Sequence, residues 1–390
     1  MKKLLLSKDA TKRLSHGKHD FYLRDFEGSV RSFQPGEWVE VEGTNESFHG
    51  FVNSFVTSGP NLRIVGKKGS LSDPLEILLA KIQFCYDHRK QFIGYDNYRL
   101  CFGEADGLPG LIIDTFENCI LMQINTAGID KFREQIKSYL KNLYKEKEIC
   151  FFDNPKYRER EVLPEFESDL INDVKVFENN FKYTISKETI QKIGYYFDHR
   201  ENRKKLEDFL KRFPTLTRGM DLFSYVGSWG LHLLRGGVEK VEFVDQANME
   251  SNTNSALEEN GFLGRGQFIR KDVFAHLDLC IQNHERFDII VSDPPAFSKS
   301  GKNLGKALGG YEKLHHKSLQ LLNDKGLYVA ASCTHGVSLE DLDQTVNKAA
   351  KRLNKNIMLL DTGVQGWDHP FKSFKSNSFY IKYLLYQVYE

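Results

Sequence analysis

From about residue 187 onward, short apolar runs alternate with helical stretches, and this alternation constrains the fold more than any other feature of the chain. One apolar run covers residues 220–223, and a glycine-containing turn and a helical stretch follow it. A second apolar run, residues 241–245, ends in Asp245. Strand, turn, helix and strand in this order form the βαβ unit of a parallel sheet. The sequence therefore predicts a doubly wound α/β domain over residues 186–390.

The turn after the first predicted strand indicates which cofactor the domain binds. A dinucleotide fingerprint needs a glycine where this chain has Tyr225, which disfavours NAD and a dehydrogenase. The pattern suits a cofactor without phosphates, such as S-adenosylmethionine (SAM). Gly227 would let the backbone approach its methionine part, and Asp245 would accept hydrogen bonds from the ribose hydroxyls. Asp221 and Asp272 also lie at or near the ends of predicted strands and would contribute to the cofactor site, with Asp272 contacting the adenine amine. The alternative is that these acids only cap the strand ends.

A second predicted site follows the fourth apolar strand of this domain. Residues 287–292 lead into Asp293, Pro294, Pro295, Ala296 and Phe297. Prolines fix φ, so the turn is rigid and holds the Asp293 carboxylate at the carboxyl edge of the sheet. Such a turn can recognise the polar edge of a planar nitrogenous base, although a structural acid in a rigid loop is the alternative.

The segment after this turn is basic. Residues 298–317 contain five lysines against one glutamate, with four glycines. This composition predicts a flexible loop that contacts an RNA backbone through Lys299, Lys302 and Lys306 and stacks a base on Tyr311. A solvated loop is the alternative.

Cys333 ends the fifth predicted strand, at the same sheet edge as Asp293. A buried, inert cysteine is the commoner case. The alternative is a thiolate that adds to C6 of a cytosine and makes C5 nucleophilic enough to take a methyl group. In that case Asp293 would hydrogen-bond or protonate N3, and His335, two residues on, could help ionise the thiol.

The N-terminal part predicts two smaller domains. Residues 1–70 show short β-strands between turns, and residues 71–185 mix helices and strands. Residues 1–33 carry eight Lys/Arg against four Asp/Glu, including Lys12, Arg13 and Lys18. This excess predicts either RNA binding or a solvated surface. The whole-chain net charge of +1 excludes a protein that coats nucleic acid nonspecifically.

Several classes of protein are disfavoured. The start of the chain has only three consecutive apolar residues, and no stretch is long enough to span a membrane. The six cysteines are scattered without a Cys-x-x-Cys pair, so we expect neither a zinc site nor disulfides. The expectation is a cytoplasmic protein with no metal and no membrane partner.

Long strings in the sequence resemble one family. They are residues 102–114, 191–203, 221–227, 293–297 and 332–335. Together they are similar to the bacterial large-subunit rRNA 5-cytosine methyltransferases, which are built as a PUA domain, an α+β domain and a Rossmann-like methyltransferase. The resemblance implies a PUA domain over residues 1–70, SAM as cofactor and large-subunit rRNA as partner. It also implies that Asp198, Arg200, Phe223 and Asp293 contribute to the cofactor pocket, with Cys333 and Asp293 catalytic.

One residue departs from related enzymes. Many RNA 5-methylcytosine enzymes carry a second cysteine where this chain has Ala296, so another base must support elimination from Cys333. Branches with the same domain plan methylate guanine at N7 or N2 without a covalent step, which is the alternative activity. A non-catalytic RNA-binding assembly factor is the alternative from another class. The oligomeric state stays open, a homodimer included.

Overall fold

The computed structural model of the chain describes residues 1–190, 194–213, 216–297 and 303–390. They divide into two compact units, which are treated separately below. The first unit contains Met1–Val174, Ile190–Tyr195 and Trp367–Pro370; the second contains Lys175–Thr189, Tyr196–Gly366 and Phe371–Glu390. Within these residues, no helix combines the length and the apolar character that crossing a bilayer requires.

The N-terminal part of the first unit is rich in strands, as predicted. Helix α1 (Lys8–Ser15) accompanies a five-stranded sheet in the order β1-β3-β4-β5-β2. The strands are β1 (Lys2–Leu4), β2 (Asp20–Phe21), β3 (Glu37–Glu42), β4 (Ser47–Val52) and β5 (Leu62–Lys67), with a 3-10 turn at Leu23–Asp25. Alternating apolar side chains such as Val39, Val41 and Ile64 form a core of their own between sheet and helix.

The rest of the first unit is an α+β layer, also as predicted. Its four-stranded sheet has the order β6-β7-β8-β9. The strands are β6 (Tyr98–Phe102), β7 (Leu111–Thr115), β8 (Cys119–Ile124) and β9 (Glu148–Phe151). The helices are α2 (Pro74–Phe92), α3 (Ala127–Asp130), α4 (Arg133–Leu143) and α5 (Pro155–Arg160), with a 3-10 turn at Gly103–Asp106. Asp73 caps the start of α2 by accepting a hydrogen bond from the Glu76 N–H.

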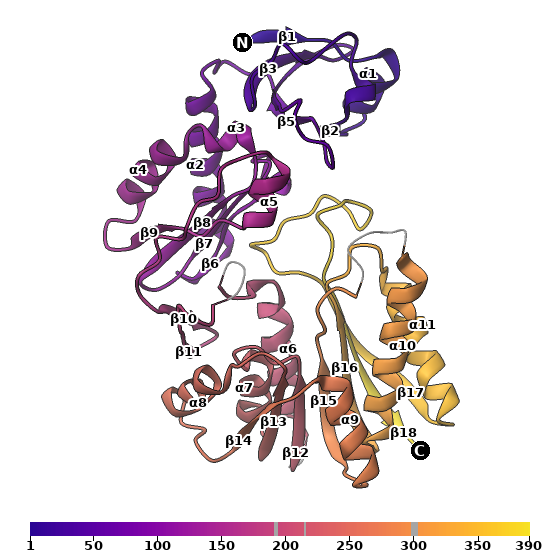
Figure 1. The fold of residues 1–390 in the computed structure, drawn as a ribbon. Helices are drawn as coiled ribbons and strands as arrows, with labels where there is room; N and C mark the ends of the chain where they lie inside the picture. Colours follow the sequence, from indigo (N-terminus) through magenta and orange to yellow (C-terminus); the bar gives the residue numbers. More distant parts are fainter. Residues whose placement is uncertain (191–193, 214–215, 298–302) are drawn as a thin grey trace. The chain divides into compact units, whose positions relative to one another are not determined.

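The second unit has the predicted doubly wound α/β fold (Figure 1). Its seven-stranded sheet runs β14-β13-β12-β15-β16-β18-β17, and the first five of these strands are parallel. The strands are β12 (Arg218–Leu222), β13 (Lys240–Asp245), β14 (Gly266–Arg270), β15 (Phe287–Ser292), β16 (Leu322–Ser332), β17 (Asn356–Gly363) and β18 (Lys382–Tyr389). Strand β18 is antiparallel to both of its neighbours, β16 and β17.

Helices cover both faces of this sheet (Figure 1). One group is α6 (Arg200–Leu210), α7 (Ser228–Arg235) and α8 (Glu250–Glu259), preceded by a 3-10 turn at Phe197–His199. The other group is α9 (Val273–Gln282), α10 (Leu304–Gln320) and α11 (Leu339–Arg352). Apolar side chains of this second group and of the central strands make up one continuous buried cluster. This packing holds the carboxyl ends of the parallel strands at one rigid edge.

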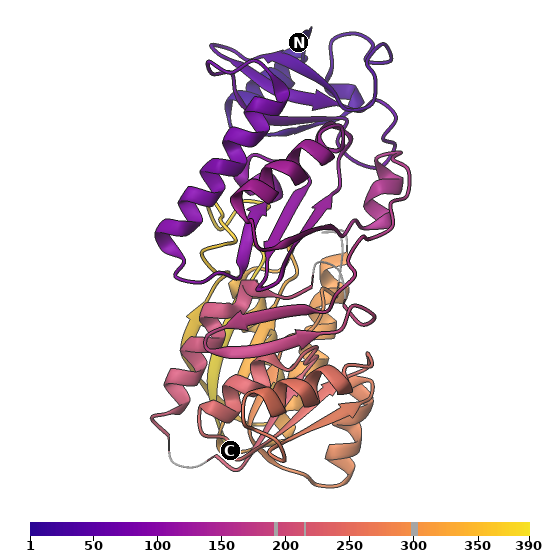
Figure 2. The ribbon, with the colours of Figure 1, turned by 90° about the vertical axis from the view of Figure 1, so that its left-hand side faces the viewer.

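The boundary between the units differs from the predicted one at residue 185. The hairpin of β10 (Val174–Glu178) and β11 (Phe181–Ile185) belongs to the second unit from Lys175 onward and packs against α8 (Figures 1 and 2). Its Glu178 is completely buried and accepts two hydrogen bonds from Arg203 of α6, at 2.9 and 2.7 Å. Burial alone would raise the pKa of Glu178, but the Arg203 charge holds it at about 2. A buried ion pair of this kind ties the hairpin to the second unit.

The basic segment after residue 303 also differs from the prediction. Residues 304–320 form helix α10, where we expected a flexible loop. Buried residues recur along it at helical spacing, among them Ala307, Tyr311, Leu314 and Ser318. The glycines of this segment suggested a mobile loop, but the helical spacing of its buried residues favours a helix. Lys299 and Lys302 lie outside the described residues.

Candidate active site

The strand order places a ligand-binding edge in the second unit. Strand β12 pairs in parallel with β13 on one side and with β15 on the other, and β15 pairs in parallel with β16. The order of strands therefore reverses between β12 and β15. Open α/β sheets bind ligands at such a switch point, outside the carboxyl ends of the strands. The predicted site residues follow these strands.

Cys333 comes directly after β16 and is half-buried, whereas the other five cysteines are buried. Its Sγ lies 3.7 Å from the carbonyl oxygen of Pro294, in the turn that follows β15. The structure thus brings the thiol to the aspartate–proline turn, as the sequence predicted from neighbouring strand ends.

The Asp293 carboxylate is held from two sides. The Trp229 indole Nε1–H donates to Oδ2 at 3.0 Å, and His199 Nε2 lies 3.7 Å from Oδ1. Trp229 and His199 are buried, while the Asp293 side chain keeps 22% of its surface exposed. Asp293 is therefore an oriented carboxylate with open acceptor positions, and the sequence did not single out either of its partners.

The turn after β12 has an unusual backbone. Phe223, Tyr225 and Gly227 all have positive φ, at 61°, 49° and 82°. For the two aromatic residues this conformation costs about 1–3 kcal/mol each, and such strain collects at ligand sites. A Cβ on Gly227 would lie 2.8 Å from the Phe243 ring, so glycine is also required there for packing.

The same turn orients Asp245. The Tyr225 N–H donates to Asp245 Oδ2 at 3.0 Å, and the Ala247 N–H donates to Oδ1 at 2.8 Å. Each carboxylate oxygen can accept a second hydrogen bond, and the side chain is only half-buried. Asp245 can therefore bind two hydroxyl groups in a fixed direction.

Asp221 is completely buried at the start of this turn. Its Oδ2 accepts a hydrogen bond from the Gly230 N–H at 2.8 Å, which anchors the first turn of α7. Its Oδ1 has no hydrogen-bond partner among the described residues. Burial raises the pKa of Asp221 well above its usual value, and the charges of Asp293 and Asp245 add to the effect. These contacts assign Asp221 to the support of the turn, and its direct contact with a cofactor stays a prediction.

Asp272 and Arg200 have structural partners as well. Asp272 is exposed and caps α9 by accepting a hydrogen bond from the Ala275 N–H at 3.0 Å. Arg200 is 1% exposed, with its Nε 3.5 Å from Glu178 Oε2. Their roles at a cofactor remain predictions.

Asp198 lies in a network with the segment just ahead of the last strand, β18. Its Oδ2 accepts a hydrogen bond from the Tyr380 hydroxyl at 2.7 Å, and the Tyr380 ring stacks on His335 at 5.4 Å. Burial lowers the pKa of His335, and the Lys382 charge lowers it further. His335 thus packs on Tyr380, and its help in ionising Cys333 stays a prediction.

Tyr196 contacts the turn after β12, and our sequence analysis assigned it no role of its own. Its ring meets that of Tyr225 edge-on at 5.5 Å. Although 36% of the residue's surface is exposed, desolvation raises the pKa of its hydroxyl. The negative charges of Asp198, Cys333, Asp293 and Asp245 act in the same direction.

Lys382 is a second residue that sequence reasoning missed. It begins β18, is 1% exposed, and donates from Nζ to the carbonyl oxygens of Thr334 at 2.7 Å and Tyr380 at 2.8 Å. Burial lowers its pKa to about 8, and the Cys333 charge acts in the opposite direction. The ammonium is thus still protonated at neutral pH, beside the residue that follows Cys333. A lone lysine in the apolar run of residues 379–386 was the available signal.

We expect Lys382→Met to raise the pH midpoint for alkylation of Cys333 by iodoacetamide by about one unit, because a nearby positive charge favours the thiolate. In the unaltered protein this help fades as pH rises through about 8, where Lys382 loses its proton. Alkylation at Cys333 can be followed by mass spectrometry, since the other cysteines are buried. Lys382→Arg should keep the original midpoint, and equal midpoints in all three proteins would contradict the prediction.

Some of the predicted RNA-binding residues are exposed, and others pair with neighbouring side chains. Lys12, Lys18 and Lys306 are exposed, which leaves RNA binding open to them. Arg13 pairs with Asp9 at 2.9 Å and Asp25 at 2.7 Å, so it also stabilises the N-terminal sheet.

The prediction that Tyr311 stacks on RNA is wrong. Its side chain is fully buried in α10. Its hydroxyl donates to Ser332 Oγ at 2.8 Å and lies 2.8 Å from Thr334 Oγ1. Tyr311 therefore orders the residues on either side of Cys333.

Comparisons with known proteins show which proteins this chain is similar to along most of its length. A ribosomal RNA large subunit methyltransferase I from Aeromonas salmonicida is 32% identical over 322 residues, which cover 80% of this chain and 80% of that protein. The protein of the same name from Klebsiella pneumoniae is 30% identical and covers 74% of this chain and 73% of its own length. No protein-family model matches the chain.

Solved structures give the same picture of the fold. A Streptococcus mutans chain assigned as a SAM-dependent methyltransferase superposes with a TM-score of 0.78 at 19% identity, covering 99% of this chain and all of that one. Another methyltransferase structure, solved in complex with SAH, superposes with a TM-score of 0.79 at 19% identity and with the same coverage.

Proposed function

Because this chain belongs to the ribosomal RNA large subunit methyltransferase I family, we propose that it methylates C5 of a cytosine in large-subunit rRNA through a covalent bond to Cys333. Family membership supports the general activity, which is SAM-dependent methylation of large-subunit rRNA. One observation carries the finer step: the half-buried thiol lies 3.7 Å from the Pro294 carbonyl, next to an oriented carboxylate.

The residues at the sheet edge fit SAM. Asp245 is half-buried and is oriented by hydrogen bonds from two backbone amides. It can accept hydrogen bonds from both ribose hydroxyls. The strained turn at Phe223 and Tyr225 ends at the N-terminus of α7, without the glycines that a pyrophosphate would need. Asp245 would hold the ribose, and this turn would border the methionine part. Bound SAM would supply an electrophilic methyl group.

The chain's own residues would perform the remaining steps. The Cys333 thiolate would add to C6 of the cytosine, and the ring electrons would move toward C5 and N3. Asp293, fixed by Trp229, would hydrogen-bond or protonate N3 and so stabilise the electron-rich ring. After C5 is methylated, a base other than a second cysteine would take the C5 proton, and the electrons of that C–H bond would re-form the ring double bond as the thiolate leaves C6. Lys382 would stabilise the leaving thiolate.

Residues 1–70 would help to bind the rRNA as a PUA domain. Exposed Lys12 and Lys18 lie on and just after α1 of this module. Many charged side chains around them form ion pairs with each other, as Arg13 does with Asp25. Contact with the RNA phosphates would therefore depend on a few exposed cations.

Asp245→Asn should weaken SAM binding by about 10–100-fold, because the uncharged amide loses the charge-assisted bonds to the hydroxyls. Calorimetric titration with SAM measures the change. Glu239→Gln is the matched control. Glu239 directly precedes β13, at the opposite end of the strand from Asp245, and this variant should bind SAM as the unaltered protein does. Equal affinities for the two variants would remove Asp245 from the cofactor site.

The proposed function is tested by mapping the methylated base. Large-subunit rRNA from cells that lack the protein would be incubated with the protein and isotope-labelled SAM, digested, and analysed by mass spectrometry. We expect the label in 5-methylcytidine. Label in a guanosine would overturn the cytosine assignment, and no label at all, despite SAM binding, would favour an RNA-binding assembly factor.

A further inference from the structure

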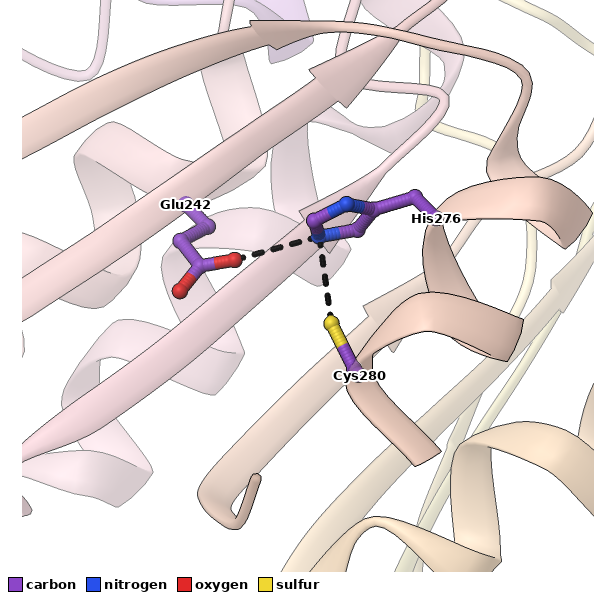
Figure 3. A group of neighbouring side chains, drawn as sticks. All are labelled: Glu242, His276 and Cys280. Atoms are coloured by element: carbon purple, nitrogen blue, oxygen red, sulfur yellow. Dashed lines mark hydrogen bonds and ion pairs between the residues drawn. The ribbon is translucent and has the colours of Figure 1, made fainter. Parts of the chain in front are cut away.

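A second group of chemistry-bearing side chains lies away from the Cys333 edge, between strand β13 and helix α9. His276 and Cys280 are four residues apart on α9 and so share one helix face, and Glu242 projects from β13 toward them (Figure 3). His276 Nε2 lies 3.2 Å from Glu242 Oε2 and 3.5 Å from Cys280 Sγ. The ligand atoms of all three residues lie within 4.8 Å of one another.

Hydrogen bonding alone accounts poorly for this arrangement. Both contacts end on the same ring nitrogen (Figure 3). A protonated Nε2 can donate to Glu242, and the Cys280 sulfur is then only a weak second acceptor of the same proton. An unprotonated Nε2 can accept from the thiol, but its lone pair then faces the Glu242 carboxylate. Three lone-pair atoms that converge in this way are the donor set of a cation.

The separations fit a tetrahedral zinc ion. Zinc lies about 2.0 Å from nitrogen or oxygen and about 2.3 Å from sulfur, which sets tetrahedral edges of about 3.3 Å for N···O and about 3.5 Å for N···S. The observed separations are 3.2 and 3.5 Å. The mixture of a carboxylate, an imidazole and a thiol is also a donor set that zinc accepts.

The groups around the cluster would support a bound ion. Glu242 uses Oε2 toward His276, while its Oε1 accepts a hydrogen bond from Arg218 Nη2 at 2.6 Å. Such outer hydrogen bonds orient the carboxylates that bind metals. Arg218 also pairs with Glu285 at 2.8 Å. Arg218 is therefore a bridge between Glu242 and a second acid that lies outside the three-residue cluster.

We propose that Glu242, His276 and Cys280 form a binding site for Zn²⁺ that fastens α9 to β13, with a water molecule in the fourth position. The site lies three residues before Asp245 on the same strand. The sequence offered only a His-x-x-x-Cys pair and a glutamate 34 residues away. This separation hid the cluster from a search for closely spaced cysteines.

The experiment uses the full-length protein, stripped of metal with a chelator and then titrated with Co²⁺. Cobalt occupies zinc sites and reports them by colour: a thiolate ligand gives a strong charge-transfer band, and tetrahedral geometry gives intense visible bands. We expect both bands in the unaltered protein and their loss when Zn²⁺ is added. Absence of a thiolate band in the folded, unaltered protein would overturn the proposal.

Substitutions locate the site. Cys280→Ala should lose the thiolate band, and His276→Ala should lose the tetrahedral bands. Cys119→Ala is the matched control, because Cys119 is equally buried but belongs to the first unit, and it should keep every band. A thiolate band that persists in Cys280→Ala would show that cobalt binds elsewhere. Zn²⁺ should also raise the melting temperature of the unaltered protein but not that of His276→Ala.

Discussion

Replacing Cys333 by alanine is expected to lower methyl transfer to rRNA by at least about 10⁴-fold, because the attacking atom of the proposed reaction is removed. The thiol lies at the aspartate–proline turn, whereas the expected ribose ligand, Asp245, is held by the backbone amides of Tyr225 and Ala247. SAM affinity should therefore be unchanged. Single-turnover transfer of labelled methyl groups measures the first quantity, and calorimetry measures the second.

Two further measurements make this result specific. Cys119→Ala removes a thiol that is fully buried in the first unit and should retain the methylation rate. RNA that carries 5-fluorocytidine should form a denaturation-resistant complex with the unaltered protein, because fluorine cannot leave as a proton does. Full activity of Cys333→Ala would exclude the covalent mechanism and move the assignment to guanine.

Replacing Asp293 by asparagine should reduce the methylation rate by about 10²–10³-fold, because the neutral amide can neither protonate N3 nor balance the ring's charge. The asparagine oxygen can still accept the Trp229 hydrogen bond, so the turn should keep its shape. The rate at saturating SAM and RNA measures the loss, and tryptophan fluorescence reports whether the surroundings of Trp229 are preserved.

Asp288→Asn is the matched control for this substitution. Asp288 lies near the opposite end of the same strand, β15, where it accepts hydrogen bonds from Thr217 at 2.7 and 2.8 Å. Its replacement should lower the unfolding free energy by about 1 kcal/mol and leave the rate per folded molecule unchanged. An Asp293→Asn variant that retains normal turnover would remove Asp293 from the reaction.

Much of the fold followed from local sequence patterns. The apolar run over residues 287–292 forms strand β15 with the same bounds, and the run over residues 241–245 lies within β13. The meeting of Cys333 and the Asp293 turn also followed, since parallel strands end at one edge.

Features that depend on long-range packing were missed. Lys382 lies 49 residues beyond Cys333 and reaches the carbonyl oxygen of its neighbour Thr334 because β18 inserts antiparallel beside β16, a pairing that no local pattern encodes. Tyr311 was misassigned because nearby glycines and lysines suggested an exposed loop. The burial of its ring depends on how α10 docks on the sheet.

The hairpin of β10 and β11 determines where this protein can be divided. A fragment that began at residue 186 would retain Arg203 but lose its buried acid, Glu178. An unpaired guanidinium in the interior costs about 3–5 kcal/mol, a large part of the folding free energy of an ordinary domain. Excision of an autonomous catalytic half should therefore start ahead of Val174, where the added strands restore the counter-charge.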